Sequence, residues 1–172
     1  GKMNISNKVY LSLGSNIGDR ESNLAQAITA IEISEGVDNV KSASFYLTEP
    51  LYNKEQEFFI NTVIGLETIL KPFDLLDLVK NIESMLGRKK QKKKNMPRII
   101  DIDILVHGES IIETDQLVIP HPNIIHRKFV LIPFDEIAPD YKIPLINLTV
   151  HDLLVSCNDQ SYVGLHDMEN KA

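Results

Sequence analysis

The sequence has little of what marks secreted or membrane proteins. Cysteine occurs once, at Cys157, which excludes an internal disulfide and fits a reducing compartment. No apolar run approaches the length of a membrane span, and no signal-peptide pattern opens the chain. We therefore expect a cytoplasmic protein that has no membrane partner.

Positive charge is also in the minority, with 18 Lys and Arg against 24 Asp and Glu and a formal net charge of −6. That balance argues against a general nucleic-acid binder, which is usually basic. The 172 residues, 43% of them hydrophobic, suit one soluble domain with a full core. We expect a single domain over 1–172, with flexible segments at 1–7 and 158–172.

One stretch, Pro97 to Val106, combines an apolar strand pattern with two acids. Its β-branched residues predict a strand, on which side chains alternate between faces. Asp101 and Asp103 therefore share one face, about 6–7 Å apart, and the isoleucines at 100, 102 and 104 share the other. Two carboxylates so close repel each other unless a cation lies between them, so the pair predicts a metal site.

The segment just before this strand is strongly basic. Seven of the eighteen Lys and Arg lie between Arg88 and Arg98, with no acid among them. A solvated linker, a nuclear-localisation-like run and a nucleic-acid patch each account for such a run alone. Because the run leads directly into Asp-x-Asp, we favour a phosphate held by the cations and bridged to the carboxylates by Mg²⁺.

The remaining periodicity predicts a β-α-β-β-α-β order up to Val106. The predicted elements are strands at 8–14, 37–49, 58–69 and 97–106, a helix capped by Asp19 or Ser22, and a helix from 72 to 87. This order favours an α+β, ferredoxin-like sandwich with a mainly antiparallel sheet and a C-terminal extension. The extension is predicted to hold a hairpin at 111–119, a helix from Asn123 or His126 to Ile137 that Pro133 kinks or breaks, and a short strand and final helix within 141–157.

Several candidate residues have ordinary structural explanations as well. Asn61 in an apolar strand is either a backbone-bonded amide or a group that reads a flat heterocycle. Phe59 and Phe129 are, on pattern alone, core residues, and Glu83 is equally well a solvated helix carboxylate. His121 and His126 lack the further ligands at the spacing that a zinc site needs.

Six motifs together resemble the 6-hydroxymethyl-7,8-dihydropterin pyrophosphokinase family. They are Leu13-Gly-Ser-Asn-Ile-Gly-Asp19, Ser44-Phe-Tyr-Leu-Thr-Glu-Pro50, Phe59-Ile-Asn61, Gly87-Arg88, Pro97-Arg-Ile-Ile-Asp-Ile-Asp103 and Ile119-Pro-His-Pro122. The resemblance implies a ferredoxin-like core and a Mg²⁺-dependent transferase, a kinase that moves diphosphate from ATP to the pterin hydroxymethyl group. AMP and the pterin diphosphate of folate biosynthesis are the products.

The resemblance also implies a role for each matching residue. The catalytic residues would be Arg88, Lys90, Lys94 and Arg98. Two Mg²⁺ ions would be bound by Asp101 and Asp103. ATP would contact Glu83, Lys90, Lys94, Arg98, Ile104, His121 and Arg127. The pterin would contact Thr48, Leu51, Phe59, Asn61, Asp101 and Phe129. ATP and the pterin would be the partners of a monomer that binds no nucleic acid.

Two departures from the family pattern lie near the expected nucleotide. The basic segment has lysines, Asn95 and Met96 where the family often has arginines and a Trp-Gly pair, and Pro122 replaces an aromatic residue. Lysine neutralises phosphate without the two-pronged contact of arginine. Two other functions remain open: a ferredoxin-like RNA-binding module, and a domain that binds pterin or nucleotide without chemistry.

Overall fold

A mainly antiparallel sheet runs through the middle of the molecule. The computed structural model describes residues 6–51, 55–87 and 99–166. The sheet strands are β1 (Asn7–Ser15), β2 (Val37–Ser42), β3 (Tyr46–Thr48), β4 (Phe59–Thr68), β5 (Asp101–His107) and β8 (Val163–Leu165). Their order is β5-β1-β4-β3-β8, with β2 also paired to β4, and every pairing is antiparallel.

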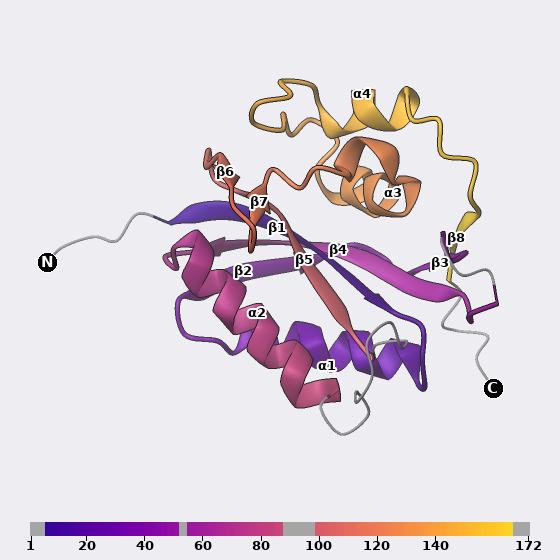
Figure 1. Ribbon diagram of the computed structural model, residues 1–172, viewed down its shortest axis with the longest axis horizontal. Helices are drawn as coiled ribbons and strands as arrows, with labels where there is room; N and C mark the ends of the chain where they lie inside the picture. Colours follow the sequence, from indigo (N-terminus) through magenta and orange to yellow (C-terminus); the bar gives the residue numbers. More distant parts are fainter. Residues whose placement is uncertain (1–5, 52–54, 88–98, 167–172) are drawn as a thin grey trace, which may run out of the picture.

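Two helices, α1 (Arg20–Glu32) and α2 (Pro72–Gly87), cover one face of the sheet (Figure 1). Asp19 caps α1 by accepting a hydrogen bond from the Ser22 amide, as the sequence predicts. Their apolar faces pack on alternate sheet residues, among them Leu13, Ile102 and Ile104. The predicted alternation is therefore confirmed on β5, since its isoleucines enter this core and its aspartates lie on the other face.

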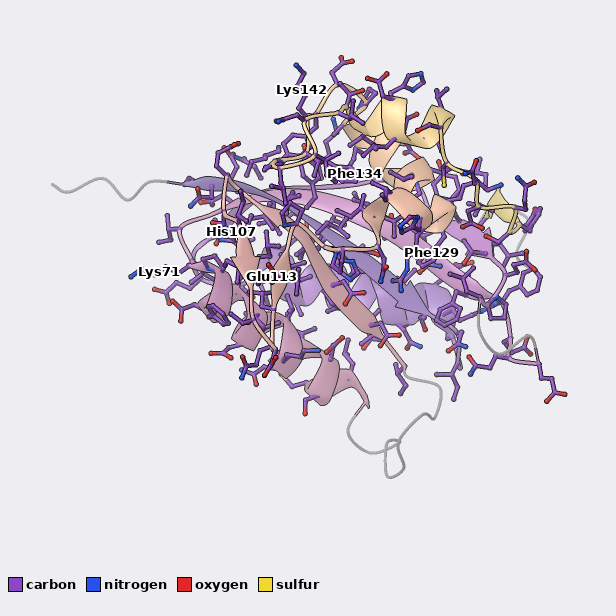
Figure 2. All side chains as sticks on the ribbon, turned by 45° about the horizontal axis from the view of Figure 1, so that its top comes forward. Lys71, His107, Glu113, Phe129, Phe134 and Lys142 are labelled. Atoms are coloured by element: carbon purple, nitrogen blue, oxygen red, sulfur yellow. The ribbon has the colours of Figure 1, made fainter. Side chains whose placement is uncertain are left out.

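The other face is covered by α3 (Lys128–Ile137) and α4 (Val150–Val155), above the sheet in Figure 1. A second core forms here around Phe134, which is labelled in Figure 2, stacks against Tyr141 and lies tilted against Tyr10. The short strands β6 (Ile112–Glu113) and β7 (Val118–Ile119) form the predicted hairpin, and a 3-10 turn, η1 (Ile124–His126), precedes α3. Within the described ranges, none of the helices is long and apolar enough to span a membrane.

The prediction of a single strand at 37–49 is wrong, because this segment forms two separate strands, β2 and β3. The Ser44 amide donates to the Glu136 carboxylate on α3 at 2.9 Å instead of joining the ladder. The Thr62 hydroxyl binds the Ser44 carbonyl at 3.0 Å. Side chains therefore occupy the backbone groups that would have continued the strand.

The predicted start of the third helix is wrong, and of the two effects predicted for Pro133, a kink or a break, the break does not occur. The helix begins at Lys128 rather than at 123 or 126, and it continues through Pro133 without a break. The side chain of Arg127, the N-cap residue, does not cap the helix, and the Lys128 amide instead donates to Asp159 at 3.0 Å. Pro133 lies in a helix of ten residues that is buried against the sheet, so packing outweighs the lost backbone bond.

The segment after Asn158, expected to be flexible, contains a strand that the sequence analysis does not predict. Val163–Leu165 pairs with Tyr46–Thr48 as β8 and extends the sheet at that edge. The His166 amide continues the pairing by donating to the Phe45 carbonyl at 2.9 Å. The described part of this segment is therefore bound to the domain.

Candidate active site

Four strands place polar or small residues in one row at one end of the sheet. In the pairing register, Asp101 lies opposite Gly14, Gly14 opposite Asn61, and Asn61 opposite Tyr46. Directly paired residues share a face, so this row lies on the face that α3 covers. The next pair on the same face is Asp103 and Ser12.

A cavity of about 230 Å³ opens between this row and the start of α3. Its walls come from β1, β3 and the residues after it, β4, β5 and α3. The lining residues are Ser12, Gly14, Thr48, Glu49, Pro50, Leu51, Phe59, Asn61, Asp101, Asp103, Arg127 and Phe129. The cavity thus gathers every residue expected to bind the pterin, from segments that are far apart in the sequence.

Asn61 is held in a fixed orientation on the floor of the cavity. Its Nδ2 donates to the Thr48 Oγ1 at 2.6 Å, and both residues are almost fully buried. Its Oδ1 lies over Gly14, since a Cβ on that glycine would come within 2.2 Å of it. The Asn61 oxygen, a hydrogen-bond acceptor, therefore occupies space that is available only because residue 14 is a glycine.

Two half-buried rings, Phe59 on β4 and Phe129 on α3, line the same cavity from the sheet and from the helix. Figure 2 labels Phe129 at the beginning of α3. The Arg127 guanidinium lies over the Phe129 ring, 5.7 Å from its centroid. Two apolar rings with an amide and a hydroxyl between them suit a flat heterocycle that has a polar edge.

A second cavity, of about 260 Å³, lies at the edge of β5 that faces away from β1. It is bounded by α2, β5, the β6-β7 hairpin and the turn before η1. The lining residues are Leu76, Lys80, Ile102, Asp103, Ile104, Asp115, Gln116, Leu117, Val118, His121, Pro122 and Asn123. Asp103 lines both cavities, so the two sites meet at this carboxylate.

His121 presents a defined hydrogen-bonding face to the second cavity. Its Nδ1 accepts from the Asn123 amide at 3.1 Å, which leaves the proton of the neutral ring on Nε2. Burial lowers the pKa of His121, and Arg127 lowers it further, while Asp103 opposes both. A neutral ring that donates from Nε2 can bind a phosphate oxygen.

Glu83 on α2 holds the edge of β5. Its carboxylate accepts from the Ile102 amide at 2.7 Å and pairs with Lys80 at 3.4 Å. Burial raises the pKa of Glu83, although the Ile102 amide and Lys80 act in the opposite direction. Glu83 therefore accepts a hydrogen bond from an amide at the edge of β5 and orients Lys80, which lines the second cavity. Glu83 itself lines neither cavity.

The carboxylates of β5 fit a magnesium ion that arrives with a phosphate chain. Asp101 is half-buried, Asp103 is exposed, and both line the first cavity from the same face of one strand. Mg²⁺ is usually held by one or two carboxylates together with substrate phosphates and water. The donor set and its position at the meeting of two cavities agree with that chemistry.

The predicted nucleotide residues divide between the two cavities. Ile104 and His121 line the second cavity, whereas Arg127 lines the first. The expected catalytic residues Arg88, Lys90, Lys94 and Arg98 lie outside the described residues.

Sequence reasoning placed Gly14 at the end of the strand predicted at 8–14 but missed it as part of the cavity floor. The available signal was a glycine inside an otherwise apolar strand, which often marks a close approach of a ligand or another chain segment. Lys80 carried no such signal, because an exposed helix lysine is ordinary.

Comparison with known proteins gives consistent matches. The model of the 7,8-dihydro-6-hydroxymethylpterin-pyrophosphokinase (HPPK) family matches residues 10–139. A 2-amino-4-hydroxy-6-hydroxymethyldihydropteridine pyrophosphokinase of Bacillus subtilis is 42% identical over 134 residues, which are 78% of this chain and 80% of that protein. The folic acid synthesis protein FOL1 of Dictyostelium discoideum is 41% identical over 147 residues, 85% of this chain but 22% of that protein.

A solved structure shares the fold. Plasmodium falciparum HPPK-DHPS, crystallised with pteroate, matches with a TM-score of 0.70 and 16% identity. The match covers 90% of this chain and 45% of that chain, so this chain spans less than half of the solved one.

Proposed function

The chain belongs to the 7,8-dihydro-6-hydroxymethylpterin-pyrophosphokinase family, and we propose that it transfers diphosphate from ATP to 6-hydroxymethyl-7,8-dihydropterin. The products are AMP and the pterin diphosphate of folate biosynthesis. One observation carries the proposal: Asp103 lines both cavities. A heterocycle in the first cavity and a nucleotide in the second bring the hydroxymethyl oxygen and the phosphate chain together at this carboxylate.

The first cavity is the proposed pterin site. Phe59 and Phe129 stack on the two faces of the ring, and Asn61 accepts from an N–H group at its edge. The Thr48 hydroxyl accepts from Asn61, so its own proton remains available to the ring. Leu51 closes the rim beside them. The prearranged walls favour the orientation from which the hydroxymethyl oxygen attacks.

The second cavity is the proposed nucleotide site. His121 donates from Nε2 to a phosphate oxygen, and Ile104 contacts the nucleotide from the wall of the cavity. Glu83 keeps the edge of β5 in place, and Arg127 reaches the phosphate chain from the side of the first cavity. The hydroxymethyl oxygen forms a bond to the β-phosphorus and gives up its proton to solvent. The bond between the β-phosphorus and the oxygen that bridges it to the α-phosphate breaks, and AMP leaves with that oxygen.

Asp101 and Asp103 would hold Mg²⁺, two ions in the proposal. Bound there, the metal would neutralise the charge on the phosphate chain and act as a Lewis acid. Asp103, which lines both cavities, and Asp101, which lines the first, are the residues that would hold it.

The basic residues Arg88, Lys90, Lys94 and Arg98 are proposed to neutralise the transferring phosphates. The support comes from their described neighbours. Gly87 and Ile99 lie together, since a Cβ on Gly87 would be 3.8 Å from the Ile99 Cβ. The two described residues that flank the four cations in the chain therefore lie close together, and Ile99 is two positions before Asp101 in the sequence.

The proposal extends to the architecture and setting of the protein. We assign the strand order β5-β1-β4-β2 with its two helices on one face to the ferredoxin-like class. Residues 1–172 are proposed to form one domain, because both cores share the central sheet. We propose a cytoplasmic monomer whose partners are ATP and the pterin, without membrane or nucleic acid.

The test is release of AMP from ATP in the presence of Mg²⁺ and 6-hydroxymethyl-7,8-dihydropterin. We expect AMP to form only when all three are present. In Asp103→Asn, turnover should fall by at least about a hundredfold, because the metal loses a charged ligand. The dissociation constant of the pterin should change less than about threefold, since the ring contacts remain intact.

The matched control is Asp38→Asn, which removes an exposed aspartate from β2 of the same sheet. Its turnover should equal that of the unmodified protein. A folded protein that binds pterin and ATP without forming AMP would indicate a binding domain and refute the enzyme proposal. Equal losses of turnover and pterin binding in Asp103→Asn would assign that carboxylate a structural role.

A further inference from the structure

The segment Asp159–Val163, which we name the clasp, joins two walls of the first cavity. It follows α4 and lies beyond residues 10–139, which the family model matches. At one end it contacts the start of α3, and at the other it pairs with the end of β3. Both contacted elements contribute lining residues to the cavity.

On the helix side, the contact is made by Asp159. Its Oδ2 accepts from the Lys128 amide at 3.0 Å, and its Oδ1 accepts from the Ser161 amide at 2.9 Å. Lys128 stands between Arg127 and Phe129, which both line the cavity. Arg127 gives α3 no side-chain cap, and the cap comes instead from Asp159, 31 positions after Lys128.

On the strand side, the contacts are made by Tyr162 and Val163. The Glu49 amide donates to the Tyr162 carbonyl at 3.2 Å, and the Tyr162 amide donates to the Glu49 carboxylate at 2.8 Å. Val163 pairs with Thr48, the residue that orients Asn61. The clasp therefore connects the Phe129 wall to the Thr48 wall within five residues.

The charge of Asp159 suits this arrangement. Burial raises its pKa, but the hydrogen bonds from Ser161 and Lys128 outweigh that effect and hold the pKa below its usual value. The carboxylate is ionised at neutral pH and accepts both bonds. A negative charge at the first turn of α3 is also favoured by the helix dipole.

We propose that the clasp sets the separation of the two walls of the pterin site, with Asp159 as a positioning residue that acts through the Lys128 amide on Phe129. The inference rests on the proposed function, because it assigns the first cavity to the pterin. Without the cap, the first turn of α3 is released, and Phe129 samples positions that no longer stack on the ring. Pterin affinity then falls, although no group that touches the pterin has changed.

The experiment measures the dissociation constant of 6-hydroxymethyl-7,8-dihydropterin by calorimetry on the full chain, with Mg²⁺ and a non-hydrolysable ATP analogue at saturation. Asp159→Ala should weaken pterin binding roughly threefold to tenfold, the range expected for the loss of a helix cap. Asp159→Asn should recover most of that loss, because asparagine caps helices about as well as aspartate.

The matched control is Thr149→Ala, which removes the side-chain cap of α4, a bond of 3.0 Å to the Asp152 amide. It should lower the midpoint of urea unfolding about as much as Asp159→Ala and leave the pterin dissociation constant within about twofold. Two results would overturn the clasp: unchanged binding in Asp159→Ala, or equal weakening in Thr149→Ala. An unmodified chain that binds no pterin would instead refute the proposed function.

Discussion

Replacement of Gly14 by alanine tests the geometry of the cavity floor most directly. Gly14 lies inside β1, opposite both Asn61 and Asp101. A Cβ at this position would be 2.2 Å from the Asn61 Oδ1 and 3.3 Å from its Cγ, where ordinary contacts begin near 3.4 Å. The amide must therefore either remain overpacked or retreat by more than about 1 Å.

Both outcomes have a similar energetic cost. Overpacking a tight site costs about 1–3 kcal/mol. Retreat breaks the 2.6 Å bond to Thr48, and leaving a buried polar group without its partner also costs about 1–3 kcal/mol. We expect Gly14→Ala to lower the free energy of unfolding by about 1–3 kcal/mol and to weaken pterin binding, because the acceptor oxygen of Asn61 moves.

A double-mutant cycle with Asn61→Ala isolates this contact. In that background the nearest remaining atom outside Asn61 is Phe59 Cδ2 at 3.6 Å, an ordinary contact, so Gly14→Ala should be neutral within about 0.5 kcal/mol. Urea unfolding supplies each free energy. Gly87→Ala, whose Cβ has room, is the control and should not destabilise the protein. Additive effects of Gly14→Ala and Asn61→Ala would refute the reasoning.

Two further predictions concern carboxylates that bind backbone amides. Glu83→Ala should cost about 1–3 kcal/mol because the Ile102 amide loses its acceptor, whereas Glu83→Gln keeps one. Since the pKa of Glu83 is raised in the folded state, that state binds the proton more tightly, and stability from this group falls as pH rises above the ordinary value of 4.5. The urea midpoint of the unmodified protein should therefore fall relative to that of Glu83→Gln as the pH rises from 4 to 7. Midpoints of the two proteins that change in parallel with pH would contradict this. Glu136→Ala should cost about 1–3 kcal/mol in the same assay, against Asp140→Ala as control, because Ser44 and Tyr46 lose their acceptor.

The local elements nearest the site were predictable because short-range patterns determine them. Alternation along β5 separates Asp101 and Asp103 from Ile102 and Ile104, and the structure confirms it. Helix α2 begins at Pro72 and ends at Gly87, as the spacing of its apolar residues and its flanking residues indicate. The family resemblance, which rested on motifs rather than periodicity, is confirmed by the match over residues 10–139.

The errors arise where distant residues compete for backbone groups. The strand expected at 37–49 is interrupted because Glu136, 92 positions away, takes the Ser44 amide. The start of α3 depends on Asp159, and β8 exists because an edge of β3 was available for pairing. No local pattern records these contacts, since each forms only after the sheet and α3 have packed together.

The same division applies to the site. The sequence by itself determined the chemistry: two carboxylates on one face of a strand, aromatic residues, an amide and a run of cations. Only the tertiary structure decided that Gly14 lies beneath Asn61, that Asp103 lines two cavities, and that the clasp connects the cavity walls. The physical reason is range, because residue type and spacing act over a few positions, whereas register between strands and the packing of α3 join residues that are tens of positions apart.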